Sequence, residues 1–358
     1  MKMVLQFNSL DERYVQRCLQ LARCGRGSTS PNPMVGAVIV CDGRIIGEGY
    51  HIRAGEPHAE VNAVRSVKEC DKELLQRSTI YVSLEPCSHY GKTPPCCDLI
   101  IECGIRRVVI GTTDCNAQVN GEGIARMQRA GIEVVTGVLE AEAQLLNRTF
   151  FTLHSLHRPY VTLKWAQSAD GFIDRKRNSI DEGAPLAIST SGSSVAVHKL
   201  RAQCDAILVG SRTAMLDNPS LTVRHWAGRN PLRLVIDTQN NLPATLRLFN
   251  DEARTVVYTR VPKDNKFGKN IEQFRLEEGD VVSQILHHLA SLKVNNLLVE
   301  GGATLLQSFI DAGMWDVARV ERNPELFIGE GVAAPFLPEG LQRSVEHCCG
   351  NEIITFVR

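Results

Sequence analysis

Hydrophobic positions recur along this chain with two spacings, one helical and one extended. Residues 9–26 place apolar side chains three or four positions apart, and Ser9 followed by Glu12 is the pattern of a helix N-cap. Further helices are predicted at EPHAEVNAVRSV, CCDLIIECGI and GIARMQRAG, and strands at VGAVIV, RIIGEGY, STIYVSLEPC, RRVVIGTTD and IEVVTGVL. Because strands alternate with helices, the pattern predicts an α/β sandwich.

A second block of mixed strands and helices follows the first. The helical stretch EAEAQLLNRTFFTLHS closes the first block, and Pro159 with a new strand marks a boundary near residues 154–158. The predicted strands of the second block are YVTLKWA, AILVGS, LRLVIDT, TVVYT, VNNLLVEGG and ARVERNPELFIG, and its helices are SSVAVHKLRAQC, VVSQILHHLASL and GGATLLQSFIDAG. The blocks do not resemble each other, so we predict two different domains, residues 1–153 and 154–358.

Composition narrows the class of protein. The chain has 358 residues, of which 43% are hydrophobic and 22% charged, and its formal net charge is zero. A neutral chain argues against a dedicated nucleic-acid binder, which usually carries a basic excess. No apolar run approaches the roughly 18 residues of a membrane span, and the N-terminal residues lack the apolar core of a signal peptide. We therefore expect a cytoplasmic protein whose twelve cysteines are reduced thiols, metal ligands or core side chains.

The first block carries a candidate metal site built from His58, Cys87 and Cys96. One histidine and two cysteines can hold Zn²⁺ and leave the fourth tetrahedral position open, which is the arrangement of a catalytic site. Bound zinc lowers the pKa of water, and a carboxylate near the ion, such as that of Glu60, can carry the proton. Pro57 predicts that the chain enters a helix at His58, where two residues so close in sequence can converge.

This pattern is the H-x-E…P-C signature of zinc-dependent deaminases, with one difference in spacing. The signature usually has two residues between its cysteines, whereas eight separate Cys87 from Cys96. Two other interpretations stay open from the residues alone. Cys97 could close a structural zinc site as a fourth ligand, and the cysteines could simply fill the core.

Together these stretches resemble the bacterial bifunctional deaminase–reductase family of riboflavin biosynthesis. The resemblance is carried by TSPNPMVGAVIV, GEGYHIRAGEPHAEVNA, YVSLEPCSHYGKTPPC, LKWAQSADG, LRAQCDAILVGSRTAMLDNPSLTVR and VEGGATLLQSFI. It spans nearly the whole chain, and EPCSHYGKTPPC is its most specific part. It implies a cytidine-deaminase-like α/β/α sandwich followed by a dihydrofolate-reductase-like α/β domain.

The resemblance also implies two consecutive reactions on a small pyrimidine ribosyl phosphate. The first is the zinc-dependent deamination of 2,5-diamino-6-ribosylamino-4(3H)-pyrimidinone 5′-phosphate. The second reduces the ribosyl chain with NADPH and yields 5-amino-6-ribitylamino-uracil 5′-phosphate. For the deaminase, the resemblance implies His58, Cys87 and Cys96 as zinc ligands, Glu60 as the proton carrier, and Asn32, His89 and Lys92 as substrate contacts. A lysine ammonium group is a suitable partner for the 5′-phosphate.

The second block gives weaker signals by itself. VEGGATLLQSF places a glycine-rich turn before a helix, where backbone N–H groups can receive phosphate, although a tight turn without a ligand reads the same way. The resemblance assigns the arginines Arg201 and Arg224 to the substrate phosphate, and it leaves Lys164 and Asp170 near the pocket without clear roles. The implied NADPH contacts are Ala166, Thr213, Asp217, Thr238, Gly302, Ala303, Thr304, Leu305, Leu306, Gln307 and Ser308, and the implied substrate contacts are Arg201, Leu221, Arg224 and Glu300.

Two loops depart from the family pattern. Asp114 to Ala117 stands where the family has Asp-Pro-Asn-Pro, and PLAIST, Pro185 to Thr190, replaces the stretch S-x-W-I-T. The second departure motivates an alternative, a deaminase fused to a non-catalytic nucleotide-binding module. A nucleic-acid base deaminase is a further alternative, which the neutral charge disfavours. We expect a homo-oligomer that takes a small-molecule substrate and binds neither nucleic acid nor membrane.

Overall fold

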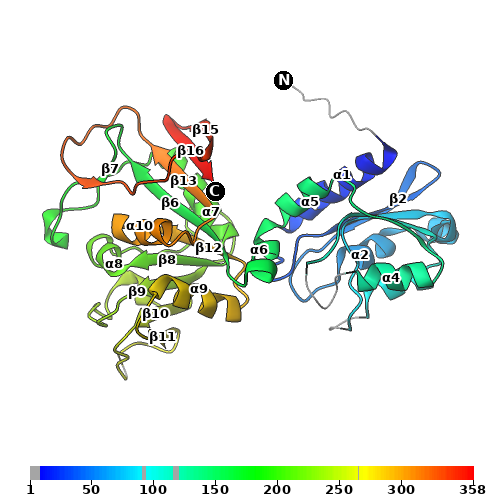
Figure 1. The fold of residues 1–358 in the computed structure, drawn as a ribbon, viewed down its shortest axis with the longest axis horizontal. Helices are drawn as coiled ribbons and strands as arrows, with labels where there is room; N and C mark the ends of the chain where they lie inside the picture. The colour runs from blue at the N-terminus through cyan, green and yellow to red at the C-terminus, as the bar shows by residue number, and fades with distance from the viewer. Residues whose placement is uncertain (1–8, 91–93, 116–120, 265) are drawn as a thin grey trace. The chain divides into compact units, whose positions relative to one another are not determined.

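The computed structural model describes residues 9–90, 94–115, 121–264 and 266–358. The chain divides into two compact units, residues 1–157 and 158–358, where the sequence predicted a division between 153 and 154. No helix in the described ranges is long and apolar enough to cross a membrane. Figure 1 shows both units, with the chain coloured from blue at its N-terminus to red at its C-terminus.

The first unit is a five-stranded sheet in the order β2-β1-β3-β4-β5. Strands β1 (Gly36–Cys41) and β2 (Arg44–Tyr50) are antiparallel, and β1 is also antiparallel to β3. The strands β3 (Thr79–Leu84), β4 (Arg107–Thr112) and β5 (Glu133–Val135) run parallel to one another. Every predicted strand of this unit is therefore present.

Helices cover both faces of this sheet (Figure 1). One core lies between the sheet and the helices α2 (Ala59–Ser66), α3 (Cys96–Glu102) and α4 (Glu122–Arg129). The other core joins α1 (Leu10–Ala22) to the opposite face, through side chains that include Val15, Cys18 and Val38. The Glu12 N–H donates to the Ser9 hydroxyl at 3.2 Å, so the predicted N-cap is confirmed. The unit is the expected α/β/α sandwich.

The helical stretch at the end of this unit forms two helices rather than one, α5 (Glu140–Leu146) and α6 (Arg148–Leu156). Between them lies the buried Asn147, whose side-chain amide accepts from the Met34 N–H at 2.8 Å and donates to the Met34 carbonyl at 2.9 Å. These two bonds attach the segment to the loop before β1. Because that loop carries Asn32, the helix break contributes to the shape of the candidate site.

The second unit is a nine-stranded sheet in the order β11-β10-β9-β8-β12-β6-β13-β16-β15. Its strands are parallel from β11 to β13, and β16 and β15 add antiparallel pairs at one edge. The parallel strands are β6 (Tyr160–Gln167), β8 (Ala206–Gly210), β9 (Leu232–Ile236), β10 (Thr255–Thr259), β11 (Ile271–Arg275), β12 (Asn296–Glu300) and β13 (Val317–Arg322). A separate two-stranded sheet pairs β7 (Phe172–Asp174) with β14 (Val332–Ala333).

Helices again lie on both faces of the large sheet. The main core packs α9 (Val281–Ser291) and α10 (Ala303–Asp311) against one face. On the other face, Ala214 of α8 (Ser211–Asp217) lies in a second core, and Leu200 of α7 (Ser191–Gln203) packs against it. Parallel strands with helices on both faces place their carboxyl ends at one edge, which is where open α/β sheets bind ligands.

The end of the chain differs from the predicted single strand. ARVERNPELFIG leaves the sheet at Arg322, and the chain returns as a hairpin of β15 (Gln342–Cys348) and β16 (Asn351–Val357). Cys349 and Gly350 form its two-residue turn with φ angles of 53° and 89°. A turn with two positive φ angles matches the right-handed twist of paired strands. Most of β15 is exposed, so it lacks the apolar alternation that would have predicted it.

Candidate functional site

Three predicted ligands of the first unit converge on one point. The ligand atoms of His58, Cys87 and Cys96 all lie within 4.8 Å of one another. The His58 Nδ1 is 3.6 Å from the Cys87 Sγ and 3.4 Å from the Cys96 Sγ. Nitrogen and sulfur bound tetrahedrally to one zinc ion are expected about 3.6 Å apart, given bond lengths of about 2.1 and 2.3 Å. The three groups therefore fit a shared zinc ion.

The local backbone explains why His58 reaches this point. His58 is the N-cap of α2, with extended dihedral angles of φ −71° and ψ 169°. The Asn62 amide donates to the carbonyls of Tyr50 at 2.9 Å and Pro57 at 3.2 Å, and so fastens the helix entry to the end of β2. Because the chain becomes helical only after His58, this side chain and that of Glu60 need not follow helical spacing.

The start of α3 wraps around Cys87, which lies in the loop after β3. The Cys96 N–H donates to the Cys87 Sγ at 3.3 Å, and the Cys97 N–H donates to the Cys87 carbonyl at 3.2 Å. Hydrogen bonds from the Cys96 thiol and from His58 lower the pKa of Cys87 and outweigh its burial. The same thiol pair raises the pKa of Cys96, as does its burial. One thiolate is thus already favoured before any metal binds.

Glu60 lies in the first turn of α2 beside this cluster and is only 3% exposed. Burial, followed by the nearby Cys87 sulfur, raises the pKa of Glu60 from 4.5 to about 7. It is not one of the three clustered ligand groups. A carboxyl group whose pKa is close to neutral can both accept and release a proton at physiological pH.

Cys97 points away from the cluster. Its side chain is fully buried in the core between α3 and the sheet, and its Sγ approaches the Asp98 carboxylate at 3.8 Å. Among the described residues, the grouping of possible ligands contains His58, Cys87 and Cys96 without Cys97. The geometry therefore favours an open three-residue site over a closed four-residue one.

His51, which no motif in the sequence indicated, joins Asn32 to the cluster of proposed zinc ligands. The His51 Nδ1 lies 3.2 Å from the Pro57 carbonyl, which can only accept, so this nitrogen carries the proton. Its Nε2 then accepts from the Asn32 amide at 3.2 Å. The His51 ring meets the His58 ring edge to face, with centroids 5.3 Å apart. The His51 ring thus lies between Asn32 and the proposed zinc ligand His58.

The remaining predicted substrate contacts of this unit lie in the loop before α3. His89 is exposed in that loop, while Lys92 lies outside the described residues. The buried Glu85 was also missed. Its carboxylate accepts from the backbone N–H groups of Asp114 and Gly121 at 3.2 Å and of Ile124 at 3.4 Å, so it ties the start of α4 to the loop that follows β4.

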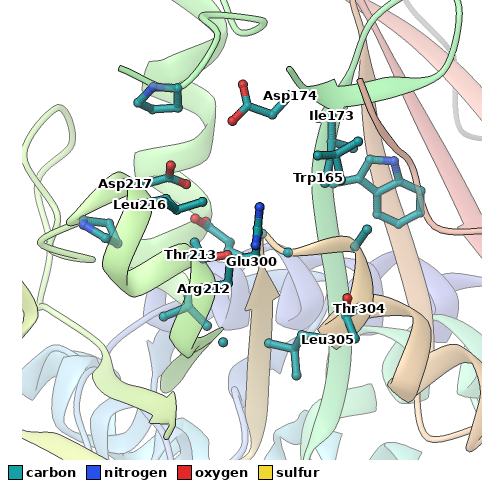
Figure 2. A pocket seen from close by; sticks show the side chains of 18 of the residues that line it. Trp165, Ile173, Asp174, Arg212, Thr213, Leu216, Asp217, Glu300, Thr304 and Leu305 are labelled. Carbon is teal, nitrogen blue, oxygen red and sulfur yellow. The ribbon is translucent and has the colours of Figure 1, made fainter. Parts of the chain in front are cut away.

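The second unit contains a cavity of about 790 Å³ at the carboxyl ends of its parallel strands. Figure 2 shows Thr213, Asp217, Glu300 and Thr304 around it. The predicted cofactor contacts that line the cavity are Ala166, Thr213, Asp217, Thr238, Gly302, Ala303, Thr304, Leu305 and Ser308. Gly302 is the N-cap of α10, and its φ of 72° suits a residue without a side chain. A cavity of this size can accommodate a dinucleotide-sized ligand.

Two predicted cofactor contacts do not line this cavity. Leu306 is fully buried in the core beneath the sheet. The Gln307 side chain turns outward, where it donates to the Asp311 carboxylate at 2.7 Å and accepts from the Phe336 N–H at 2.8 Å. The helical period explains both, because successive residues of α10 face different directions and only one side of the helix meets the cavity.

The predicted substrate residues Arg201 and Glu300 form an ion pair in the cavity wall. The Arg201 guanidinium donates two hydrogen bonds to the Glu300 carboxylate, at 2.6 and 3.1 Å. Burial favours the neutral acid, but the adjacent Arg201 charge outweighs it and holds the pKa of Glu300 below its ordinary value. Leu221 also lines the cavity. Arg224 is exposed and is not part of the lining. Partial burial of its guanidinium, followed by the nearby Arg201 charge, lowers the pKa of Arg224.

Lys164 and Asp170, which had no assigned roles, now have contacts. Lys164 lines the cavity, and its Nζ lies 3.8 Å from the buried Glu321 carboxylate. Asp170 accepts from the Gly329 N–H at 2.7 Å and from the Ile328 N–H at 3.1 Å. Asp170 therefore holds the loop before β14 rather than a ligand.

Arg177 is a buried residue of this site that no sequence motif indicated. Its guanidinium binds the carboxylates of Asp174 at 2.6 Å and Asp217 at 2.5 Å, and it donates to the carbonyls of Gly183 and Leu216. It thereby links the predicted cofactor residue Asp217 to the segment that precedes the PLAIST loop. Residues 185–189 of that loop line the cavity, so the altered loop still forms one of its walls.

Comparisons with known proteins match both units. Residues 8–112 match the family described as the cytidine and deoxycytidylate deaminase zinc-binding region, and residues 159–350 match the RibD C-terminal domain. The riboflavin biosynthesis protein RibD of Aquifex aeolicus is 40% identical over 330 residues, which are 90% of this chain and 89% of the relative. RibD of Escherichia coli is 39% identical over 352 residues, which are 93% of this chain and 92% of the relative.

Solved structures also match the chain over nearly its whole length. A crystal structure of a diaminohydroxyphosphoribosylaminopyrimidine deaminase/5-amino-6-(5-phosphoribosylamino)uracil reductase from Thermotoga maritima matches with a TM-score of 0.87 and 36% identity, covering 97% of this chain and 98% of that chain. RibD of Acinetobacter baumannii matches with a TM-score of 0.86 and 31% identity, with the same coverage. The similarity therefore extends through both units.

Replacing Glu60 by Gln is expected to stabilise the zinc-free protein at pH 8. The folded state favours the neutral acid, because the pKa rises from 4.5 to about 7. The stability that this group contributes is fully present below its unfolded pKa and is lost as the pH rises through its folded pKa. The gain at pH 8 should be about 3 kcal/mol, since each pKa unit corresponds to about 1.4 kcal/mol.

Urea unfolding of chelator-treated protein at pH 4.5 and pH 8 measures this effect. Wild type and Glu60→Gln should differ little at the lower pH and clearly at the higher. Glu142→Gln, on an exposed position of α5, is the matched control. The same difference at both pH values would contradict the assignment of a raised pKa to Glu60.

Proposed function

The chain belongs to the RibD family of riboflavin biosynthesis proteins, and we propose that it acts on 2,5-diamino-6-ribosylamino-4(3H)-pyrimidinone 5′-phosphate. It is a bifunctional enzyme, a zinc-dependent deaminase joined to an NADPH-dependent reductase. The first unit removes the amine from the pyrimidine ring, and the second reduces the ribosyl chain of the product to a ribityl chain. The observation that carries the proposal is the convergence of His58, Cys87 and Cys96 beside the buried Glu60 in a chain whose relatives match both units.

In the deaminase, this chain's residues would hold the reacting groups and move two protons. His58, Cys87 and Cys96 would hold the zinc ion, which when bound would lower the pKa of water. Glu60 would accept a proton from the attacking water and pass it to the adjacent ring nitrogen, and would then carry the remaining hydroxyl proton to the amine nitrogen. The carbon–nitrogen bond then breaks, ammonia leaves, and the ring carbon keeps the oxygen as a carbonyl. Asn32, held by His51, orients the pyrimidine ring.

In the reductase, the protein mainly positions two ligands. NADPH, when bound along Thr213, Asp217, Thr238 and the N-terminal turn of α10, supplies the hydride. Arg201 and Arg224 bind the substrate phosphate, and Glu300 orients Arg201 through their ion pair. A hydride delivered to the ribose carbon that bears the amine would replace the bond from that carbon to the ring oxygen, which would become a hydroxyl by taking up a proton from water. Orientation inside the cavity accounts for most of such a rate enhancement.

The alternative of a deaminase fused to a non-catalytic nucleotide-binding module is disfavoured. Its motivation was the altered PLAIST loop, but residues of that loop still line the cavity. The second unit matches the RibD C-terminal domain across residues 159–350. The change in sequence therefore alters a wall of the site without removing the site.

The proposal also covers the oligomeric state of the protein and its location in the cell. The edge strand β15 exposes its backbone and Val345, and such an edge favours pairing with another chain. All twelve cysteines are free thiols in the structure, which suits the reducing cytoplasm. We expect sedimentation analysis of the purified enzyme to show a homo-oligomer, and a purely monomeric species at micromolar concentration would contradict this part of the proposal.

The amount of bound zinc distinguishes the proposed ligand Cys96 from its neighbour Cys97. Cys87→Ser and Cys96→Ser should each lower bound zinc well below one ion per chain, because two protein ligands remain. Cys97→Ala should keep one ion per chain, since its thiol lies in the core. Plasma mass spectrometry of the purified proteins gives the stoichiometry, with the exposed Cys70→Ser as the control. Loss of zinc in Cys97→Ala alone would overturn the ligand set.

Glu60→Gln should separate the two activities. We expect deamination to fall by about a thousandfold or more, because the proton carrier is lost, while NADPH oxidation with the deaminated product stays within about twofold of wild type. Ammonia release and absorbance of NADPH measure the two steps independently. Loss of both activities would argue against separate sites, and failure of the wild type to oxidise NADPH with this product would sink the reductase half of the proposal.

A further inference from the structure

A buried histidine lies next to the two arginines of the reductase site. His198 is in α7, one helical turn before Arg201, and is only 3% exposed. Its Nδ1 lies 3.0 Å from the backbone N–H of Arg224, which donates to it. Because Nδ1 accepts this bond, the proton of the neutral ring resides on Nε2. His198 thus connects the helix that carries one arginine to the loop that carries the other.

The charges around His198 favour its neutral form. Arg201 faces it from α7, Arg224 and His225 from the loop, and Glu300 from β12. The His225 ring meets the His198 ring edge to face, with centroids 4.7 Å apart. Burial, then the two arginines, lowers the pKa of His198 to about 4. The ring therefore keeps its lone pair on Nδ1 and accepts the Arg224 N–H throughout the physiological pH range.

Arg224 itself is poised for an anion. Arg201 is neutralised by Glu300, whereas the described chain forms no ion pair between a carboxylate and the Arg224 guanidinium. After burial, the nearby Arg201 charge lowers the pKa of Arg224, while the Glu252 carboxylate acts in the opposite direction without forming an ion pair with it. A phosphate dianion supplies the missing negative charge.

We propose that His198 is a positioning residue of the reductase, which holds the backbone at Arg224 so that Arg224 and Arg201 bind the same substrate phosphate. The inference rests on the proposed function. His198 acts through the hydrogen bond to the Arg224 N–H, and it need not touch the substrate. A protonated or missing imidazole would leave that N–H without its acceptor and free the loop that carries Arg224.

Two amide substitutions test the position of the acceptor. In His198→Asn, the side-chain oxygen can take the place of Nδ1, whereas in His198→Gln it lies one bond farther out. With the deaminated substrate and NADPH, we expect His198→Gln to raise KM about tenfold, the cost of one lost hydrogen bond, with kcat within about threefold of wild type. His198→Asn should restore KM to within about threefold.

Inorganic phosphate provides a probe that needs no turnover. A ³¹P NMR titration should show weaker phosphate binding in His198→Gln than in wild type or His198→Asn. A substrate analogue without the 5′-phosphate should be reduced equally well by all three proteins. His288→Asn is the matched control, because that histidine bonds to Tyr258 on the other side of the sheet. Reduction of the analogue without the 5′-phosphate reports on the intactness of the second unit in each preparation.

Separate results test the role of His198 and the proposed function. Equal KM and equal phosphate binding in His198→Gln and wild type would overturn the role of His198, as would an equal loss with the analogue that lacks phosphate. If wild type fails to oxidise NADPH with the deaminated substrate, the proposed function fails, while the phosphate titration still decides the role of His198. Should His198→Gln not fold, the pair of wild type and His198→Asn decides it, because a tenfold higher KM in His198→Asn would contradict the proposed acceptor.

Discussion

The first site depends on bringing several electron-rich groups to one buried point. A histidine nitrogen and two cysteine sulfurs from three segments lie within 4.8 Å of one another, and the Glu60 carboxyl is buried beside them. Burial, followed by repulsion from the Cys87 sulfur, raises the pKa of Glu60, and the hydrogen bond between the two thiols, with burial, raises the pKa of Cys96. A zinc ion removes that repulsion. The extended entry of α2 and the start of α3 are the backbone conformations that make this convergence possible.

The second site uses charge differently. Lys164 lies between the carboxylates of Glu321 and Glu300, and Glu300 in turn pairs with Arg201, so the cavity wall carries charges of alternating sign. Arg177 balances Asp174 and Asp217 in the same way. Such balanced networks hold side chains rigidly without creating a strong acid or base. This suits a reaction in which the cofactor carries the reactive electrons and the protein positions two ligands.

Local sequence patterns predicted most of the elements near the two sites. The Ser9 cap, the strands of the first unit and the turn before α10 follow from residues close together in the chain. The predictions were wrong where a distant contact decides the local structure. Asn147 divides one predicted helix in two because its amide bonds to Met34. The hairpin of β15 and β16 pairs with β13, although β15 itself is too polar to read as a strand.

By itself, the sequence determined the chemistry available to this protein. It supplied the one histidine, the two cysteines and the carboxylate at a spacing that suits an open zinc site, along with the arginines and the glycine-rich turn of a phosphate site. Only the tertiary structure decided which side chains meet. It turned Cys97 into the core and Gln307 outward, and it placed His51, Arg177 and His198 beside partners that the sequence did not indicate. The reason is physical: residue type and local spacing set what a side chain can do, but the packing of sheets and helices from distant segments sets the distances at which it acts.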